Sequence, residues 1–205
     1  MKIDIRTVVC GAYQENAFVV SAEGRDDCVV VDPGDGLAAL RRAVGDQKPA
    51  AILLTHGHFD HTLAAPALAA QSGAPVYIHA GDREMLFDAG LNAYDAYVAE
   101  LPSPAPMPTL DYAPTLDVAG LNFQVLHTPG HSRGSVCLYL PDEGVLFSGD
   151  TLFRAGYGRL DLYGGDPDAM ADSLRALFLL PGEVRVYSGH GSVTTIALER
   201  GRYRL

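Results

Sequence analysis

With 205 residues, of which 48% are hydrophobic and 20% charged, the chain is long enough for one globular domain with a full hydrophobic core. No apolar run approaches the roughly 20 residues that a membrane-spanning helix needs. The formal net charge of -10 disfavours nucleic-acid and polyphosphate partners, because their binding depends on Lys and Arg side chains that neutralise phosphates.

The N-terminus and the cysteines indicate the compartment. Residues 1–6 carry charges where a secretory signal has its apolar segment, so we expect no export signal and a cytoplasmic location. Cys10, Cys28 and Cys137 are odd in number, far apart and without CxxC spacing, and we expect them to be buried thiols.

The first half of the chain alternates short β-branched runs with turn signals and Ala- and Leu-rich segments. Leu37, Leu40 and Val44 recur at i, i+3 and i+7, which marks one face of a short helix. In chain order the predicted elements are strands at 3–9, 16–21 and 28–32, the helix over 37–44, a strand at 50–55, a helix over 62–71, a strand at 76–79, a helix through 85 and another around 94–101.

A proline-rich stretch separates the two halves. It contains Pro102, Pro104, Pro106, Pro108 and Pro114. Prolines at this density exclude both a helix and a central strand. The stretch is either an interdomain linker or a loop over the surface. We favour the loop, because candidate metal-binding residues lie on both sides of it.

The second half predicts strands at 121–126, 135–140, 145–149 and 184–188. A helix is expected from 168 to 179, with Asp166 as its N-cap and Pro167 at its first position. Its buried face would consist of Met170, Leu174, Leu177 and Phe178.

A cluster of metal-binding side chains follows the apolar run 51–55. Residues 56–61 read His-Gly-His-Phe-Asp-His, so that three imidazoles and one carboxylate lie within six residues. Protonated imidazoles this close together repel one another, and a bound cation removes that repulsion. We therefore predict a metal site formed by His56, His58, Asp60 and His61.

Three further candidate ligands follow predicted strands, each next to a glycine that allows a close approach of the backbone. They are His131, Asp150 and His190. Seven ligands are too many for a tetrahedral structural zinc, but they fit two metal ions that share a bridging carboxylate and keep open positions for water.

This constellation resembles the metallo-β-lactamase superfamily, and within it the glyoxalase II-like group. The similar segments are 55–61, 128–131, 148–151, 158–159 and 189–190. The resemblance implies an α/β fold of the αββα type, two mixed sheets flanked by helices, as a single domain over residues 1–205. The chain ends fifteen residues after His190, so we expect no C-terminal helical domain of the kind that binds glutathione in full-length glyoxalase II enzymes.

The resemblance also divides the ligands between two divalent metal ions. His56, His58 and His131 would hold the first ion. The second would be held by Asp60, His61 and His190, with Asp150 as the bridge between them. Imidazole and carboxylate ligands suit zinc, with iron or manganese as alternatives.

The implied function is a metal-dependent hydrolase that cleaves thioesters such as S-lactoylglutathione, with a metal-bridging hydroxide as the nucleophile. Asp60 would act as the catalytic residue that orients this hydroxide or accepts its proton. Arg159 matches a basic position that contacts glutathione in the family, but Asp161 stands where the family has an aromatic residue and Ser192 where it has a tyrosine. The expected partner is a small-molecule thioester, with no nucleic acid and no membrane, and the oligomeric state is left open.

Two other functions share this type of site. A persulfide dioxygenase uses one iron held by two histidines and a carboxylate, for which His56, His131 and Asp150 are present. Processing ribonucleases share the His-x-His-x-Asp-His motif, but the net charge argues against a nucleic-acid hydrolase.

Other polar residues also lie near the predicted strand ends. Asp32 is either a partner that orients a ligand imidazole or a turn former before a proline. Arg133 is either a contact for an anionic substrate group or an ordinary surface charge. We expect His79 and His127 to be packing residues, and we expect Tyr94, Tyr97 and residues 102–108 to cover the cleft.

Overall fold

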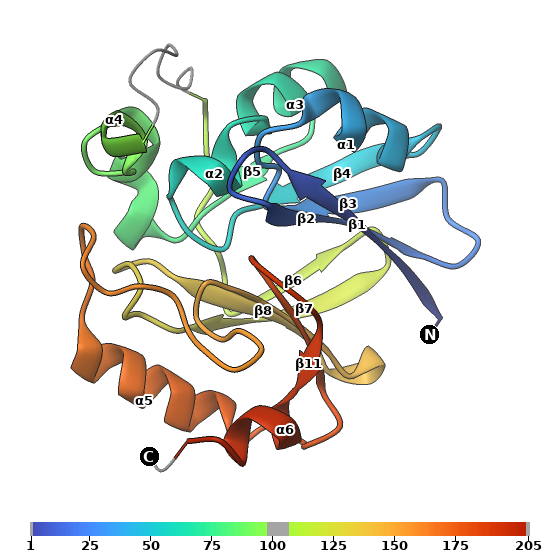
Figure 1. Cartoon of the computed structure of the whole chain (residues 1–205). Helices are drawn as coiled ribbons and strands as arrows, with labels where there is room; N and C mark the ends of the chain where they lie inside the picture. Colours follow the sequence, from blue (N-terminus) through green and yellow to red (C-terminus); the bar gives the residue numbers. More distant parts are fainter. Residues whose placement is uncertain (1, 98–106, 204–205) are drawn as a thin grey trace.

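The computed structural model describes residues 2–97 and 107–203. Two β-sheets lie face to face, and helices cover the outer face of each (Figure 1). This is the αββα arrangement that we expected from the sequence.

The first sheet has the strand order β1-β2-β3-β4-β5. Its strands are β1 (Ile3–Cys10), β2 (Glu15–Ala22), β3 (Asp27–Val31), β4 (Lys48–Leu53) and β5 (Val76–Tyr77). The first three strands pair antiparallel, whereas β3, β4 and β5 pair parallel, because helices return the chain to the same edge between them. These helices are α1 (Leu37–Val44), α2 (Phe59–Thr62) and α3 (Ala65–Ser72).

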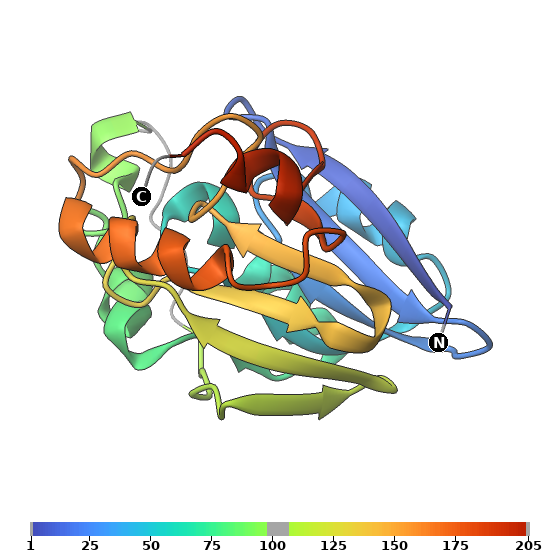
Figure 2. The same ribbon diagram turned by 90° about the horizontal axis from the view of Figure 1, so that it is seen from below.

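The second sheet has the order β11-β10-β9-β8-β7-β6. Its strands are β6 (Thr115–Val118), β7 (Leu121–His127), β8 (Val136–Leu140), β9 (Val145–Gly149), β10 (Arg185–Ser188) and β11 (Thr194–Thr195). A short 3-10 helix, η2 (Pro141–Glu143), joins β8 to β9, and α5 (Pro167–Leu177) lies between the parallel strands β9 and β10. The helix α6 (Ile196–Arg200) follows β11, and Figure 2 shows α5 and α6 lying across the outer face of this sheet.

The hydrophobic core has three layers. Leu40 and Val44 of α1 pack with Leu68 of α3 on the outer face of the first sheet. Side chains such as Leu53 and Phe147 fill the space between the two sheets. The outer face of the second sheet is covered by the predicted face of α5, namely Met170, Leu174, Leu177 and Phe178, all of which are buried. Burial of each such side chain stabilises the fold by about 1.5 to 3 kcal/mol.

The helix α5 begins as its sequence predicts. The Asp166 side chain accepts hydrogen bonds from the backbone N–H groups of Asp168 and Ala169, and Pro167 occupies the first turn, where its missing N–H leaves no bond unmade. The three cysteines are buried free thiols, as expected.

The connection between the two sheets contains a 3-10 helix, η1 (Ala80–Phe87), and a short helix, α4 (Tyr94–Tyr97). Beyond it, Leu110 forms an isolated parallel bridge with Tyr77 and so extends the edge of the first sheet before the chain enters the second. The helix that the sequence predicts through residue 85 corresponds to η1, which is a 3-10 helix and not an α-helix. Pro102, Pro104 and Pro106 of the proline-rich stretch lie outside the described residues, whereas Pro108 and Pro114 are described.

The predicted helix over 62–71 is two helices in the structure. It is divided after Leu63, the C-cap of α2, and α3 has Pro66 in its first turn. Proline lacks the N–H that a helix interior requires, so it begins a helix rather than continuing one. The elements β6, β11 and α6, which the sequence analysis did not predict, have only four, two and five residues, too few for a periodic pattern. In the described parts of the chain, no helix combines the length and the apolar character needed to span a membrane.

Candidate metal centre

The candidate ligands lie where strands of both sheets end. Residues 56–61 follow β4, and His131 lies in the loop between β7 and β8. Asp150 comes directly after β9, and His190 comes two residues after β10. All seven side chains predicted to bind metal are brought into one region, where the two sheets meet.

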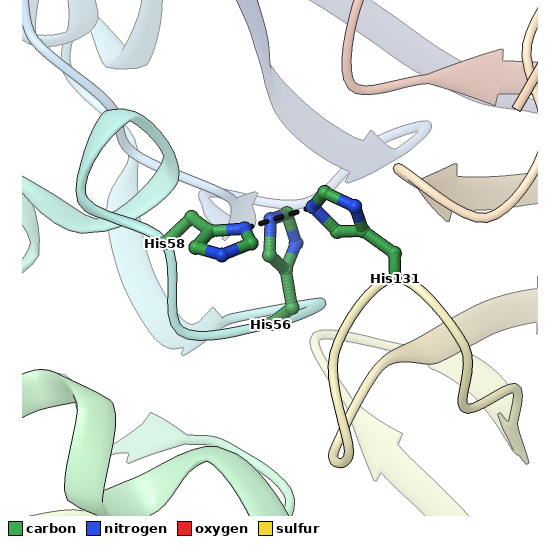
Figure 3. Close-up of side chains that lie close together, drawn as sticks. All are labelled: His56, His58 and His131. Carbon is green, nitrogen blue, oxygen red and sulfur yellow. Dashed lines mark hydrogen bonds between the residues drawn. The ribbon is translucent and has the colours of Figure 1, made fainter. Parts of the chain in front are cut away.

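The first group consists of His56, His58 and His131, whose ligand atoms lie within 4.8 Å of one another. His58 Nδ1 is 2.8 Å from His131 Nε2, and Figure 3 shows these two rings facing each other with His56 beside them. The rings are buried and meet edge to face, with centroids 4.5 to 4.9 Å apart. Three nitrogens are thus available to one small cation.

The second group consists of Asp60, His61 and His190. Asp60 Oδ2 is 3.4 Å from His190 Nε2 and 3.9 Å from His61 Nε2. Asp60 and His61 belong to the short helix α2, whereas His190 comes from the opposite sheet.

Asp150 lies between the two groups. Its Oδ1 is 3.4 Å from His61 Nε2, and its Oδ2 is 3.6 Å from His131 Nε2 and 3.7 Å from His190 Nε2. Gly189 allows this approach, because a Cβ there would overlap Asp150 Oδ1 and the His61 ring. One carboxylate therefore faces both groups, as a bridging ligand must.

Four buried atoms of these groups have no hydrogen-bond partner among the described residues. They are His56 Nε2, His58 Nε2, His61 Nε2 and Asp150 Oδ1. Buried polar atoms in native proteins nearly always have a partner, so each unsatisfied one requires an explanation. Imidazole nitrogens and carboxylate oxygens are ligands for divalent transition metals, and the residues therefore fit such ions.

The protonation of the histidines agrees with this fit. Burial and the neighbouring imidazoles hold the pKa of His56 well below its usual range, and burial and His131 lower that of His58 to about 3. Both rings are therefore neutral, which is the form that binds metal. Burial alone would lower the pKa of His61, but Asp60 and Asp150 raise it well above its usual value. The carboxylates of Asp60 and Asp150 thus stabilise a positive charge beside the His61 ring.

Most ligand imidazoles are oriented by a second contact at their other nitrogen. Asp32 Oδ2 is 3.1 Å from His61 Nδ1, which supports an orienting role for Asp32 over that of a turn former alone. The remaining partners are Thr55 Oγ1 for His56 at 3.0 Å, the Arg159 carbonyl for His131 at 2.7 Å and the Tyr13 carbonyl for His190 at 3.1 Å. Such contacts fix the tautomer and direct the opposite nitrogen, Nε2, toward the site.

Asp32 is itself held in place. Its φ of 45° lies in the left-handed region, which Asp tolerates better than most residues. The backbone N–H and the hydroxyl of Thr55 donate hydrogen bonds to its two carboxylate oxygens at 2.7 and 2.6 Å. The strained backbone of Asp32 is therefore tied to the segment that carries the histidines.

Several of these partners were missed by the sequence analysis. The carbonyls of Tyr13 and Arg159 have no sequence signal, because any residue supplies a backbone carbonyl. Gly158 offers a partial signal, since a Cβ there would overlap the Asp150 carbonyl and lie 2.7 Å from His131 Nδ1. Asp82, whose carboxylate contacts the loops that carry His56, His58 and His131, follows a predicted strand, but the sequence predicts only a helix there.

A cavity of about 320 Å³ opens beside the two groups. Asp60, His190 and Asp150 reach it, with side chains that are 19%, 27% and 10% exposed. His58, His131 and Arg159 also line it, and the rest of the wall is formed by Tyr13, Phe59, Phe153 and Leu162. A small molecule can therefore reach the carboxylates from an apolar entrance.

Tyr94 does not cover this cavity, contrary to expectation. It is buried and packs edge to face against Phe59, with ring centroids 5.7 Å apart, so it supports the wall from behind. Tyr94 is the first residue of α4, and its side chain is buried instead of lining the cavity. The sequence predicted a helix here but not the direction of this side chain. Residues 98–106 lie outside the described residues, so the covering role predicted for 102–106 and the end of the helix predicted around 94–101 stay predictions. Residues 107 and 108 are described and are not among those that line the cavity.

His79, His127 and Arg133, which the sequence also singled out, are not among the described residues that line the cavity. His79 and His127 stack on each other with centroids 4.2 Å apart, as packing residues do. Arg133 donates a hydrogen bond to the Tyr163 hydroxyl at 3.2 Å. Arg159 does line the cavity, and its guanidinium is paired with Asp161.

Comparisons with known proteins agree with this geometry. The family model of the metallo-β-lactamase superfamily matches residues 10–190. The solved structure of the BLEG-1 B3 metallo-β-lactamase superposes with a TM-score of 0.90 at 38% identity, covering 97% of each chain. A protein solved in a di-iron-bound form superposes with a TM-score of 0.84 at 43% identity, covering 95% of this chain and 96% of that one. The hydroxyacylglutathione hydrolase GloC of Haemophilus influenzae is 30% identical over 97% of this chain and 95% of its own.

Proposed function

Because the chain belongs to the metallo-β-lactamase superfamily, we propose that it is a metal-dependent hydrolase that cleaves thioesters such as S-lactoylglutathione. The observation that carries the proposal is the pair of ligand groups joined by Asp150 at the base of an accessible cavity. The likeness to a hydroxyacylglutathione hydrolase over nearly the whole chain supports the thioester as the bond that is cleaved.

The proposed site holds two divalent metal ions. His56, His58 and His131 would hold the first ion, and Asp60, His61 and His190 would hold the second. Asp150 would be the ligand shared by the two ions, since its oxygens lie near both groups. Zinc is the proposed metal, with iron and manganese as alternatives, and the relative solved with two iron ions supports iron as one of these.

Metal ions bound here supply a Lewis acid that polarises the thioester carbonyl and lowers the pKa of water, so that hydroxide is available at neutral pH. Among the protein's own groups, Asp60 is the one proposed to accept the proton of the attacking water. Burial alone would raise the pKa of Asp60, but His61 and His190 bring it below its ordinary value, so the carboxylate is ionised and able to act as a base.

The apolar walls have a complementary role. Tyr13 and Phe59 meet edge to face, with ring centroids 5.3 Å apart, and form a continuous aromatic surface at the cavity. This surface displaces water around the bound ester and strengthens electrostatic interactions at its carbonyl. The cavity volume of about 320 Å³ suits a small molecule.

Two other reactions are alternatives to thioester hydrolysis at this site. A one-iron persulfide dioxygenase would use His56, His131 and Asp150, but one ion there would leave His61 Nε2 buried without a partner. That atom favours a second ion. Hydrolysis of a β-lactam amide is a second candidate function, supported by the likeness to BLEG-1.

The test measures metal content and activity on one preparation of the purified protein. We expect about two metal ions per chain and release of thiol from S-lactoylglutathione. Asp60→Asn should lower kcat by about 10²- to 10⁴-fold, whereas His127→Gln, outside the cavity lining, should leave it unchanged. A single iron with oxygen uptake on glutathione persulfide, or cleavage of a chromogenic cephalosporin without thiol release, would contradict the thioesterase proposal.

A further inference from the structure

The entrance of the cavity contains an ion pair that bears on substrate choice. Arg159 is the single Arg or Lys among the described residues that line the cavity. Its Nε and Nη2 atoms donate to Asp161 Oδ1 and Oδ2, each at 2.7 Å, so the pair is bidentate. One hydrogen-bonding edge of the guanidinium, formed by Nε and Nη2, is thus occupied by a carboxylate of the protein itself.

Asp161 also brings negative charge to this entrance. The hydrogen bonds from Arg159 lower its pKa to about 2, so it is ionised at neutral pH. Its side chain is 68% exposed, and it is held beside the cavity-lining Arg159 by the ion pair. The chain as a whole has a formal net charge of -10. A substrate carboxylate that approaches Arg159 therefore meets a carboxylate already in place and an unfavourable overall field.

The rest of the wall offers apolar contacts instead. Phe153 and Leu162 line the cavity together with Tyr13 and Phe59, and Leu162 directly follows Asp161 in the chain. An uncharged aliphatic or amide-containing group can rest on this surface without a charged partner.

We propose that the natural thioesters of this site carry an uncharged, largely apolar thiol part, and that Asp161 is a specificity-determining residue that selects against thiol parts with carboxylates. This inference rests on the thioester hydrolase function proposed above and adds the substrate class. S-Lactoylglutathione, whose thiol part carries two carboxylates and one ammonium group, is then a poorer substrate than an uncharged ester of the same acid.

The size of the expected effect follows from the exposure of the pair. Ion pairs between exposed side chains contribute up to about 1 kcal/mol, which corresponds to about a fivefold change in an equilibrium constant. Asp161→Asn should therefore favour a carboxylate-bearing ligand by about fivefold, because it weakens the bidentate pairing of the guanidinium and removes a repulsive charge.

The first experiment compares two esters on the metal-loaded full chain: S-lactoylglutathione and S-lactoyl-N-acetylcysteamine, which have the same acyl group. The wild type should have the higher kcat/KM for the uncharged ester. Asp161→Asn should raise kcat/KM for the glutathione ester about fivefold and leave the uncharged ester nearly unchanged. Asp172→Asn is the matched control, because Asp172 also pairs with an arginine, Arg175, at 2.6 Å but lies on α5 outside the cavity lining.

The second experiment measures binding without turnover. The Kd of S-hexylglutathione and of S-hexyl-N-acetylcysteamine, two thioethers that cannot be hydrolysed, is determined by calorimetry at low and high salt. Asp161→Asn should tighten only the glutathione thioether, and salt should reduce the gain.

The two proposals fail in different ways. An unchanged ratio of the two ligands in Asp161→Asn, or a wild type that prefers the glutathione compounds, would overturn the role of Asp161. Absence of hydrolysis of both esters, with the expected change in thioether binding, would contradict the thioesterase function and leave the charge selection intact.

Discussion

Asp82 Oδ2 accepts a hydrogen bond from the Ser132 hydroxyl at 2.5 Å and so joins two loops that are far apart in the sequence. The same carboxylate accepts the backbone N–H of Gly57 at 3.0 Å and that of Gly134 at 2.6 Å. Gly57 lies between His56 and His58, and Ser132 follows His131. One buried carboxylate therefore fixes the distance between the segments that carry all three histidines of the first group.

Asp82→Asn tests this link. An amide has one acceptor oxygen, so its NH₂ group would face a backbone or hydroxyl donor and leave it unpaired. We expect a loss of about 1 to 3 kcal/mol in the free energy of unfolding and a weaker first metal site. Denaturant unfolding and metal titration measure the two effects. Asp111→Asn, which removes an exposed ion pair with Arg83, is the control and should leave metal affinity unchanged.

The candidate ligands could be found from the sequence because their chemistry is carried by side chains at recognisable positions. His56, His131, Asp150 and His190 each follow a hydrophobic run, and such runs predicted the buried strands correctly. Strands of the two sheets end close together, and this brings these residues into one site although they are far apart in the sequence.

The contacts that orient the ligands could not be found in this way. The Arg159 carbonyl reaches His131 because residues 150–159 fold back on themselves, as in the hydrogen bond from Gly158 N–H to the Asp150 carbonyl at 2.8 Å. No periodic pattern encodes such a loop. The Asp161 pairing was missed for the same reason, since two nearby charges do not reveal which one faces a cavity.

Asp32→Asn should lower metal affinity at the second group. The amide weakens the contact with His61 Nδ1 that directs Nε2 toward the metal, and loss of such an orienting partner typically costs about 10- to 100-fold in affinity. Glu15→Gln is the matched comparison, because Glu15 is equally buried but its Oε1 is 3.8 Å from the same nitrogen, beyond hydrogen-bond distance. Competition with a chromophoric chelator measures both affinities. Equal losses in the two variants would indicate that negative charge matters here rather than the hydrogen bond.

Removal of metal should destabilise the fold as well as abolish activity. Without an ion, His56 Nε2, His58 Nε2 and Asp150 Oδ1 are buried without a hydrogen-bond partner among the described residues. With metal at 100 to 1,000 times its Kd, each ion adds about 3 to 4 kcal/mol to the free energy of unfolding. Thermal unfolding with and without a chelator should show this difference, and added metal should restore it. Asp150→Asn should reduce the difference, whereas an equal chelator effect in that variant would argue against Asp150 as a shared ligand.

Asn16 connects the two sheets at the site. Its Nδ2 donates to the carbonyls of Ser188 and Gly191 at 3.0 and 2.9 Å, on both sides of His190, while its backbone N–H donates to the Gly189 carbonyl at 2.7 Å. The start of β2 therefore holds the loop that supplies one ligand of the second group. Asn16→Ala keeps the backbone bond but leaves two carbonyls without their side-chain donor.

The expected result for Asn16→Ala is a loss of about 1 to 3 kcal/mol in the free energy of unfolding, together with weaker binding of one metal ion and unchanged binding of the other. Asn122→Ala removes an exposed hydrogen bond to Asp117 and should change stability by at most about 0.5 kcal/mol. Stepwise metal titration distinguishes the two ions. If both sites weakened equally, the loop of His190 would not be the element that Asn16 positions, and a general loosening of the interface between the sheets would account for the result.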